Sequence, residues 1–187
     1  MIRILAAILG ALWLGGTAVA GDVADKATAA EGLVADGKFT EALAALDDAA
    51  SAVWDEAPLT FRRVLWVAEP PGGFGAYNPR ETNEYASGDD MIVYSEPIGF
   101  GWAKAGDVWK TNLAADLVIK TKAGDVLFTQ KDFQKLEVSS RVRNHEFMAR
   151  FTYTLTGIAK GEYSAETTLR DTVSGKTGSF ELPFVIK

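Results

Sequence analysis

The chain has 187 residues, 48% of them apolar, with no cysteine and a formal net charge of -6 at neutral pH. This length allows one domain of ordinary size with a small attachment. Acidic side chains outnumber scattered basic ones, which disfavours a nucleic-acid partner because such proteins present a basic patch to phosphates. The lack of cysteine excludes disulfides, thiol catalysis, cysteine-ligated metal and a lipidated cysteine anchor, so stability must come from apolar burial.

Residues Met1–Ala20 have the pattern of a secretory signal. One positive charge at Arg3 precedes an apolar stretch, and small residues end at Ala20. The apolar stretch is shorter than the roughly 20 residues of a membrane-spanning helix, and no basic cluster follows it. We expect cleavage after Ala20, a product without a membrane anchor, and a periplasmic or secreted location. A bacterial source is favoured because the remaining chain has no Asn-x-Ser/Thr sequon.

Residues 21–57 have a helical composition, rich in Ala, Asp and Glu. Asp36-Gly37 predicts the end of a first helix, because glycine adopts the left-handed cap conformation, and Thr40 is a candidate N-cap for a second helix. One apolar stripe at i, i+3, i+4 and i+7 spacing is expected along the second helix. Its members are Phe39, Ala42, Leu43, Leu46, Ala49, Ala50, Val53 and Trp54.

The segment from Ala30 to Ala50 resembles the turn and second helix of a tetratricopeptide-type hairpin, mainly in the run from Gly37 to Leu43. Only one such unit is visible, whereas repeat proteins stack about three to bury a continuous core. The resemblance therefore implies a lone antiparallel helical hairpin that lies against the rest of the chain or against a partner.

Residues 58–187 change to short β-rich runs separated by Gly, Pro, Asn and Asp, which predicts seven or eight strands. No helix-length pattern interrupts them, so a parallel sheet with helical crossovers is disfavoured. We predict a mainly β fold, an antiparallel two-sheet sandwich, after a small α-helical hairpin. The expected strands are Phe61–Ala68, Met91–Glu96, Trp109–Thr121, Val126–Thr129, Lys135–Ser139, Phe147–Leu155, Tyr163–Leu169 and Phe180–Ile186.

The last 27 residues, from Gly161-Glu162-Tyr163 through Ser174-Gly175-Lys176 to the final apolar strand, resemble the closing hairpin of bacterial immunoglobulin-like or fibronectin-type-III-like modules. The resemblance implies an immunoglobulin-like sandwich and says nearly nothing about function. The cysteine pair of antibody domains is missing. The whole chain resembles exported bacterial proteins that join a small helical segment to such a sandwich, and this resemblance implies no activity.

A catalytic constellation is hard to find. The one histidine, His145, has no Gly-x-Ser-x-Gly elbow to accompany it, and a single histidine without cysteine makes a poor zinc site. We expect no cofactor. Asp89 and Asp90 are weak calcium candidates in a polar turn, which leaves a calcium-stabilised structural domain as one alternative. A second alternative is an enzyme for envelope carbohydrate that uses Asp89, Asp90 or Glu96 beside an aromatic surface.

Two glycine-aromatic loops, residues 71–77 and 97–102, are the most unusual stretches of the sandwich. If exposed, their flat rings would stack on sugars or hold an apolar peptide; otherwise they would close one end of the sandwich or pack on the helical hairpin. The candidate contact residues are Phe74, Tyr77, Phe100, Trp102 and Trp109. We expect a non-enzymatic exported binding or assembly module whose partner is an envelope protein or glycan. The sequence leaves its oligomeric state open.

Overall fold

The structure is a computed structural model that describes residues 16–187, with side chains described from Gly21 onward. Most of the predicted signal segment, including the charge at Arg3, lies outside the described residues. Residues 16–187 form two helices and nine strands, and they divide into two compact units at the boundary between Val53 and Trp54.

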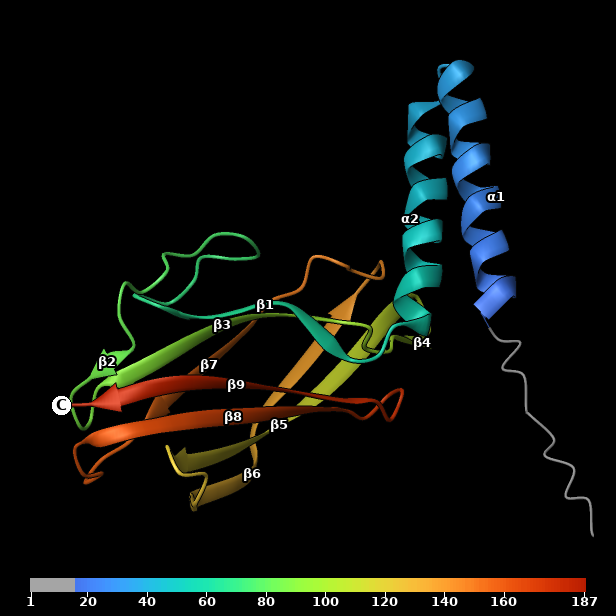
Figure 1. Cartoon of the computed structure of the whole chain (residues 1–187). Helices are drawn as coiled ribbons and strands as arrows, with labels where there is room; N and C mark the ends of the chain where they lie inside the picture. Colours follow the sequence, from blue (N-terminus) through green and yellow to red (C-terminus); the bar gives the residue numbers. More distant parts are fainter. Residues whose placement is uncertain (1–15) are drawn as a thin grey trace, which may run out of the picture. The chain divides into compact units, whose positions relative to one another are not determined.

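The first unit is the predicted helical hairpin, α1 (Gly16–Ala35) and α2 (Phe39–Glu56), whose helices lie side by side in Figure 1. The predicted stop is confirmed, because Gly37 has a φ of 74° and the Lys38 amide donates to the Leu33 carbonyl at 2.9 Å. The Thr40 cap is wrong by two residues. The Lys38 carbonyl accepts the first hydrogen bond of α2, from Ala42, so Thr40 already lies inside the first turn.

The expected single stripe of α2 is also wrong. Ala42 and Ala49 are buried, whereas Phe39, Leu43, Leu46 and Val53 are exposed. The i+3 and i+4 spacings wrap around more than one side of a helix, and here the small residues occupy the buried side.

The second unit is a two-sheet sandwich, which confirms the predicted mainly β fold class. Its smaller sheet has the antiparallel order β1-β3-β7, formed by β1 (Thr60–Val67), β3 (Asp90–Ile98) and β7 (Ala149–Thr154). The larger sheet runs β2-β9-β8-β5, with β4 and β6 also paired to β5. Its members are β2 (Glu84–Tyr85), β4 (Ala103–Ala105), β5 (Val108–Thr121), β6 (Val126–Ser140), β8 (Gly161–Asp171) and β9 (Thr177–Ile186).

This order is that of an immunoglobulin-like sandwich. Strands β1, β3 and β7 take the places of A, B and E, and β5, β8 and β9 take those of C, F and G. Constant-type immunoglobulin domains add a fourth strand beside E. Within residues 16–187 no strand pairs with that edge of β7, because the chain passes directly from β6 to β7.

The core lies between the two sheets and is built from their alternate residues. In β7 the alternation is complete: Ala149, Phe151 and Tyr153 are buried, and the residues between them are exposed. Trp66 of β1 reaches across the core to rings of the other layer, with centroid distances of 5.6 Å to Tyr85 and 6.3 Å to Phe184. Edge-to-face contacts of this kind are the favourable geometry for aromatic pairs.

Two predicted short strands, 126–129 and 135–139, are a single strand, β6. Its register against β5 shifts between the partners of Ala115 and Leu117, and there Asp132 has a φ of 51°. The extra residues form a bulge, which interrupts the hydrophobic pattern that would mark one continuous strand. The strands β2 and β4, of two and three residues, are too short for a periodic signal and are absent from the sequence prediction.

Candidate functional site

Phe100 and Trp102, two of the predicted contact residues, lie in the core rather than on a binding face. Their side chains are 0% and 8% exposed. The Phe100 ring packs edge-on against Trp54 at 5.1 Å and against Phe147 at 5.0 Å. The second glycine-aromatic loop therefore closes one end of the sandwich, and neither ring offers a face to a ligand.

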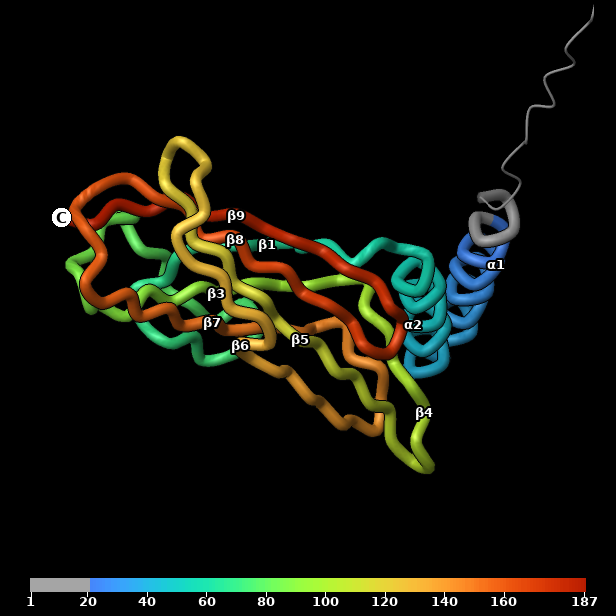
Figure 2. The backbone as a smooth tube through the Cα atoms, turned by 90° about the horizontal axis from the view of Figure 1, so that it is seen from below, coloured from blue at the N-terminus to red at the C-terminus, as the bar shows by residue number. Residues whose placement is uncertain are grey.

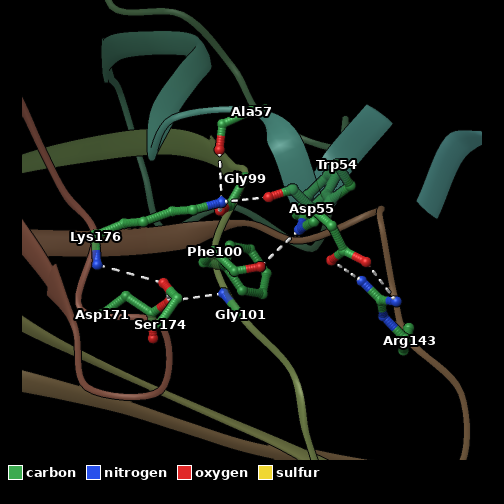
Figure 3. A network of polar contacts seen from close by, with 10 residues as sticks. All are labelled: Trp54, Asp55, Ala57, Gly99, Phe100, Gly101, Arg143, Asp171, Ser174 and Lys176. Atoms are coloured by element: carbon green, nitrogen blue, oxygen red, sulfur yellow. Dashed lines mark hydrogen bonds and ion pairs between the residues drawn. The ribbon is translucent and has the colours of Figure 1, made fainter. Parts of the chain in front are cut away.

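Polar groups fix the same end of the sandwich (Figure 3). The Lys176 ammonium donates to the backbone carbonyls of Asp55, Ala57 and Gly99 at 2.7, 2.7 and 3.0 Å. The buried Asp171 carboxylate accepts from the Gly101 amide at 2.6 Å and from the Ser174 hydroxyl. All of these acceptors and donors are already occupied, so the cluster is structural.

Trp109 is half-buried and is already covered by cations. The Lys104 ammonium lies 5.1 Å and the Arg143 guanidinium 5.6 Å from the centre of its ring. Arg143 also pairs with Asp55, with 3.1 Å between Nη1 and Oδ2. His145 packs beside Trp54, with ring centroids 4.9 Å apart. These contacts give His145 a packing role at the closed end of the sandwich.

The first glycine-aromatic loop folds over the outer face of β3. Phe74 and Tyr77 are half-buried, and the Tyr77 ring lies 4.2 Å from that of Tyr94. The Tyr94 hydroxyl accepts from the Gly75 amide at 2.8 Å and donates to the Glu96 carboxylate at 2.7 Å. Burial raises the pKa of Tyr94 to about 12, so the phenol stays protonated and keeps both bonds.

The carboxylates considered for calcium or for glycoside chemistry do not converge. Asp89 accepts from the Ala86 amide at 2.8 Å, within the turn before β3, and Asp90, the first residue of β3, accepts from the Thr154 hydroxyl of β7 at 2.6 Å. Glu96 lies six residues further along the same strand, about 20 Å away at 3.3 Å per residue. In residues 16–187 no three His, Cys, Asp or Glu side chains gather as metal ligands.

The structure shows a different candidate site, a groove of about 410 Å³ between β6 and β7. It opens where the two sheets separate, because β6 pairs only with β5 and β7 only with β3. Most of the lining side chains are apolar. They include Leu117 and Ile119 of β5, Leu127, Phe128 and Phe133 of β6, Tyr153 of β7, and Leu155 and Ile158 beyond it.

The floor of the groove belongs to the packed core of the sandwich. Leu117, Ile119 and Tyr153 are buried, and the Tyr153 hydroxyl is 2.6 Å from that of Thr167 in the opposite sheet. Burial raises the pKa of Tyr153 well above its ordinary value, so the phenol is neutral at physiological pH. A ligand on this floor meets an uncharged, apolar surface.

One wall of the groove is the hairpin between β5 and β6, which extends beyond the neighbouring strands in Figure 2. The hairpin turns between the predicted strands 109–121 and 126–129: Gly124 has a φ of 95°, and the Thr121 amide donates to the Asp125 carbonyl at 2.9 Å. Beyond the turn, Val126, Leu127 and Phe128 are 59%, 53% and 46% exposed. Three consecutive exposed apolar residues on an edge strand invite pairing with another chain.

The opposite wall is the free edge of β7. The Arg150 carbonyl accepts from the Gln134 side chain of β6 at 3.0 Å, so it points away from β3. Backbone groups of alternate residues in an antiparallel strand share an edge, which places those of Thr152 and Thr154 on the same side. A strand in the groove would therefore find donors and acceptors in register.

Sequence reasoning predicted a strand at 126–129 but not a site there. The available signal was the run Val126-Leu127-Phe128, which does not alternate with polar residues as a strand with one buried face should. A continuous apolar run is also typical of a strand buried on both faces. Only the structure distinguishes an exposed run from a buried one, and it shows that these three side chains are exposed.

Comparisons with known proteins identify no family for this chain. No family model matches the sequence, and no curated protein matches it. A conjugative transposon lipoprotein from Bacteroides eggerthii aligns over 69% of this chain and 98% of its own, with 13% identity and a TM-score of 0.33. The sporulation control protein Spo0M from Bacillus subtilis aligns over 70% of this chain and 50% of its own, with 12% identity and a TM-score of 0.30.

The chain thus spans about half the length of Spo0M. TM-scores this low carry no inference about function. Among the described residues, no helix combines the length and the apolar character needed to cross a bilayer.

Proposed function

We propose that this protein is a non-enzymatic, exported binding module whose sandwich takes up an extended, apolar peptide segment of a partner protein in the groove between β6 and β7. The observation that carries the proposal is the pairing of an apolar groove with the free edge of β7. Export is inferred from the signal-like residues 1–20.

Binding would follow the mode of strand addition. The peptide backbone bonds to the groups of Thr152 and Thr154 and becomes a fourth strand of the smaller sheet. Successive side chains of a strand point to opposite faces, so alternate peptide residues enter the groove and contact Phe128 and Phe133. Backbone bonds supply affinity for any extended chain, and the apolar lining selects the side chains.

The lining of the groove favours a peptide over a glycan as the ligand. A sugar-binding site needs polar side chains beside its aromatic platform, to bond the hydroxyl groups. The groove is bordered instead by aliphatic and phenyl side chains, with Gln130 and threonines as its polar members. The rings expected to form a sugar platform, Phe100 and Trp102, are in the core.

The test uses the full chain and a displayed library of random linear 12-residue peptides. We expect selection of peptides with apolar residues at alternate positions. In the variant Phe128→Asp, affinity for the selected peptides should fall at least about tenfold, because the wall of the groove becomes charged. Val142→Asp is the matched control, since Val142 is also exposed, at 61% against 46% for Phe128, and does not line the groove.

Amide hydrogen exchange locates the contact. Bound peptide should slow exchange at Thr152 and Thr154, whose amides face the groove edge, more than elsewhere in the sandwich. The proposal would be contradicted if the selected peptides bound equally to Phe128→Asp and the wild type. It would also be contradicted by selected peptides without alternating apolar residues, or by slowed amide exchange confined to another surface.

A further inference from the structure

The helix α2 carries an exposed apolar line that the sandwich groove does not involve. Phe39, Leu43, Leu46 and Val53 are 63%, 64%, 46% and 54% exposed, and the exposed Ala50 completes the line. We call these five residues the α2 seam. It belongs to the helical unit and shares no residue with the groove between β6 and β7.

The spacing of the α2 seam is that of a coiled coil. Its members follow one another at intervals of four, three, four and three residues. This is the repeat of 3.5 residues that keeps one side of a helix facing a second helix over several turns. The α2 seam runs the length of the helix, with Phe39 at its first residue and Val53 in its last turn.

The first helix does not cover the α2 seam. The buried side of the hairpin is made of alanines, Ala30 in α1 and Ala42 and Ala49 in α2. Small residues let two helices approach closely, and they leave the larger side chains of α2 on another side of the helix. The hairpin thus presents its larger apolar residues outward, ready for another helix.

The charge of the hairpin indicates which kind of helix would bind the α2 seam. Residues 21–53 contain seven carboxylates against two lysines. Asp47 lies directly beside the α2 seam, whereas Glu41 and Asp48 lie on the opposite side of α2. A second copy of the hairpin would bring the same excess of negative charge, Asp47 included, to the contact, which is unfavourable. A helix with basic flanks is complementary.

We infer that the α2 seam is a docking site for an amphipathic helix of a partner protein, with apolar residues at coiled-coil spacing and lysine or arginine beside them. Side chains of the partner pack between Leu43 and Leu46, while its basic side chains meet Asp47. The charges speed association and set specificity, and the apolar contact holds the complex.

The experiment measures fluorescence anisotropy of labelled synthetic 21-residue helices added to the full chain. The first peptide has leucine at both core positions of each heptad and lysine beside them. The second replaces those lysines with glutamate, and the third has the composition of the first in scrambled order. We expect binding of the first peptide, at least about tenfold stronger than that of the other two.

The variant Leu43→Asp/Leu46→Asp separates apolar docking from simple charge attraction. It makes the hairpin more acidic, so attraction alone would strengthen binding of the basic peptide, whereas docking on the α2 seam requires a loss of at least about tenfold. Ala44→Asp adds a charge on the same helix, outside the α2 seam, and should leave binding intact. Circular dichroism checks that helix content is kept, as expected for substitutions at exposed positions.

Access to the α2 seam in the free chain is measured with a thiol reagent, since the chain has no cysteine of its own. Leu46→Cys should react as fast as Ala44→Cys, and the basic peptide should slow only the former. Any of four results would overturn the inference. Leu46→Cys could react slowly without peptide, all three peptides could bind equally, or none could bind. The fourth result is a dimer of the free chain that Leu43→Asp/Leu46→Asp dissociates.

Discussion

Single residues around the closed end of the sandwich have little freedom to change. Asp171 is 2% exposed, and its carboxylate accepts from backbone amides on two sides, those of Gly101 and Val173, at 2.6 and 2.9 Å. Bonds to a carboxylate are stronger than those between neutral groups, and a buried amide left without a partner is costly. One side chain thereby joins the 97–102 loop to the β8–β9 turn.

Gly178 of β9 is predicted to tolerate no side chain. A Cβ at this position would lie 2.1 Å from the Leu59 carbonyl oxygen, closer than any van der Waals contact. Gly178→Ala should therefore destabilise the sandwich by about 1–3 kcal/mol, the usual cost of overpacking. Urea denaturation followed by tryptophan fluorescence measures this. The matched control is Gly73→Ala, where a Cβ meets nothing within 4 Å; equal midpoints for the two variants would refute the steric account.

At the scale of single residues, the sequence predicts which positions are special but not whether their side chains are buried. The glycine-aromatic pattern marks Phe100 and Trp102 correctly as special, but a ring between glycines is equally compatible with a ligand platform and with a plug. The deciding partner is Trp54, whose indole donates to the Phe100 carbonyl at 2.7 Å from 46 residues away. No local spacing reports such a contact, so the burial of these rings required the structure.

Among the elements, β6 has the most unusual construction. At its bulge, the Asp132 amide donates to the Asp116 carboxylate of β5 at 2.8 Å, and the Arg170 guanidinium of β8 bonds to both Asp116 and Asp132. Asp132 has a left-handed φ, an uncommon conformation for a residue other than glycine. The three side chains hold the bulge, and the bulge separates the exposed half of β6 from the half that covers the core.

We predict that the stabilisation of the fold by the Asp116–Arg170 ion pair at this bulge depends on pH. The bonds from Arg170 lower the pKa of Asp116 below its ordinary value of 3.8, so the folded state binds this proton less readily than the unfolded state does. The stabilisation is complete above 3.8 and is lost as the pH falls through the lowered pKa. Asp116→Asn should thus have a lower urea midpoint than the wild type at pH 6.

At pH 3 the gap between these two midpoints should be smaller than at pH 6. Asp107→Asn, in the exposed turn between β4 and β5, is the control and should match the wild type at pH 6. A gap that stays constant or widens on acidification would show that the carboxylate of Asp116 is not what holds the bulge.

Elements with a clear period were predictable, and those set by pairing were not. The strands β5, β7, β8 and β9 alternate over many residues, and their predicted positions are confirmed to within a few residues. The bulge in β6 depends on its register against β5, and the free edge of β7 depends on which strands pair with it. The apolar spacing of α2 was visible, but which side of the helix faces α1 depends on the size of the residues there.

For the whole molecule, the sandwich core begins before its first strand. The boundary between the compact units falls after Val53, and Trp54 belongs to the sandwich. Gly99 and Gly178 admit the backbone of residues 57–59 at distances that a Cβ would obstruct, and Leu59 is 3% exposed. The composition changes from helical to β-rich at residue 58, the predicted boundary, so residues 54–57 of the sandwich unit precede that change.

A comparison of two fragments tests where the sandwich begins. The fragment 54–187 keeps Trp54 against Phe100 and the carbonyls of residues 55 and 57 that Lys176 binds, whereas the fragment 60–187 loses both. We predict that the shorter fragment is less stable by at least about 3–5 kcal/mol, the cost of removing a buried tryptophan. Urea denaturation measures the difference, and Trp54→Ala in the full chain should reproduce most of it. Equal stability of the two fragments would place the start of the domain at β1 and make the contacts of Trp54 and Lys176 dispensable.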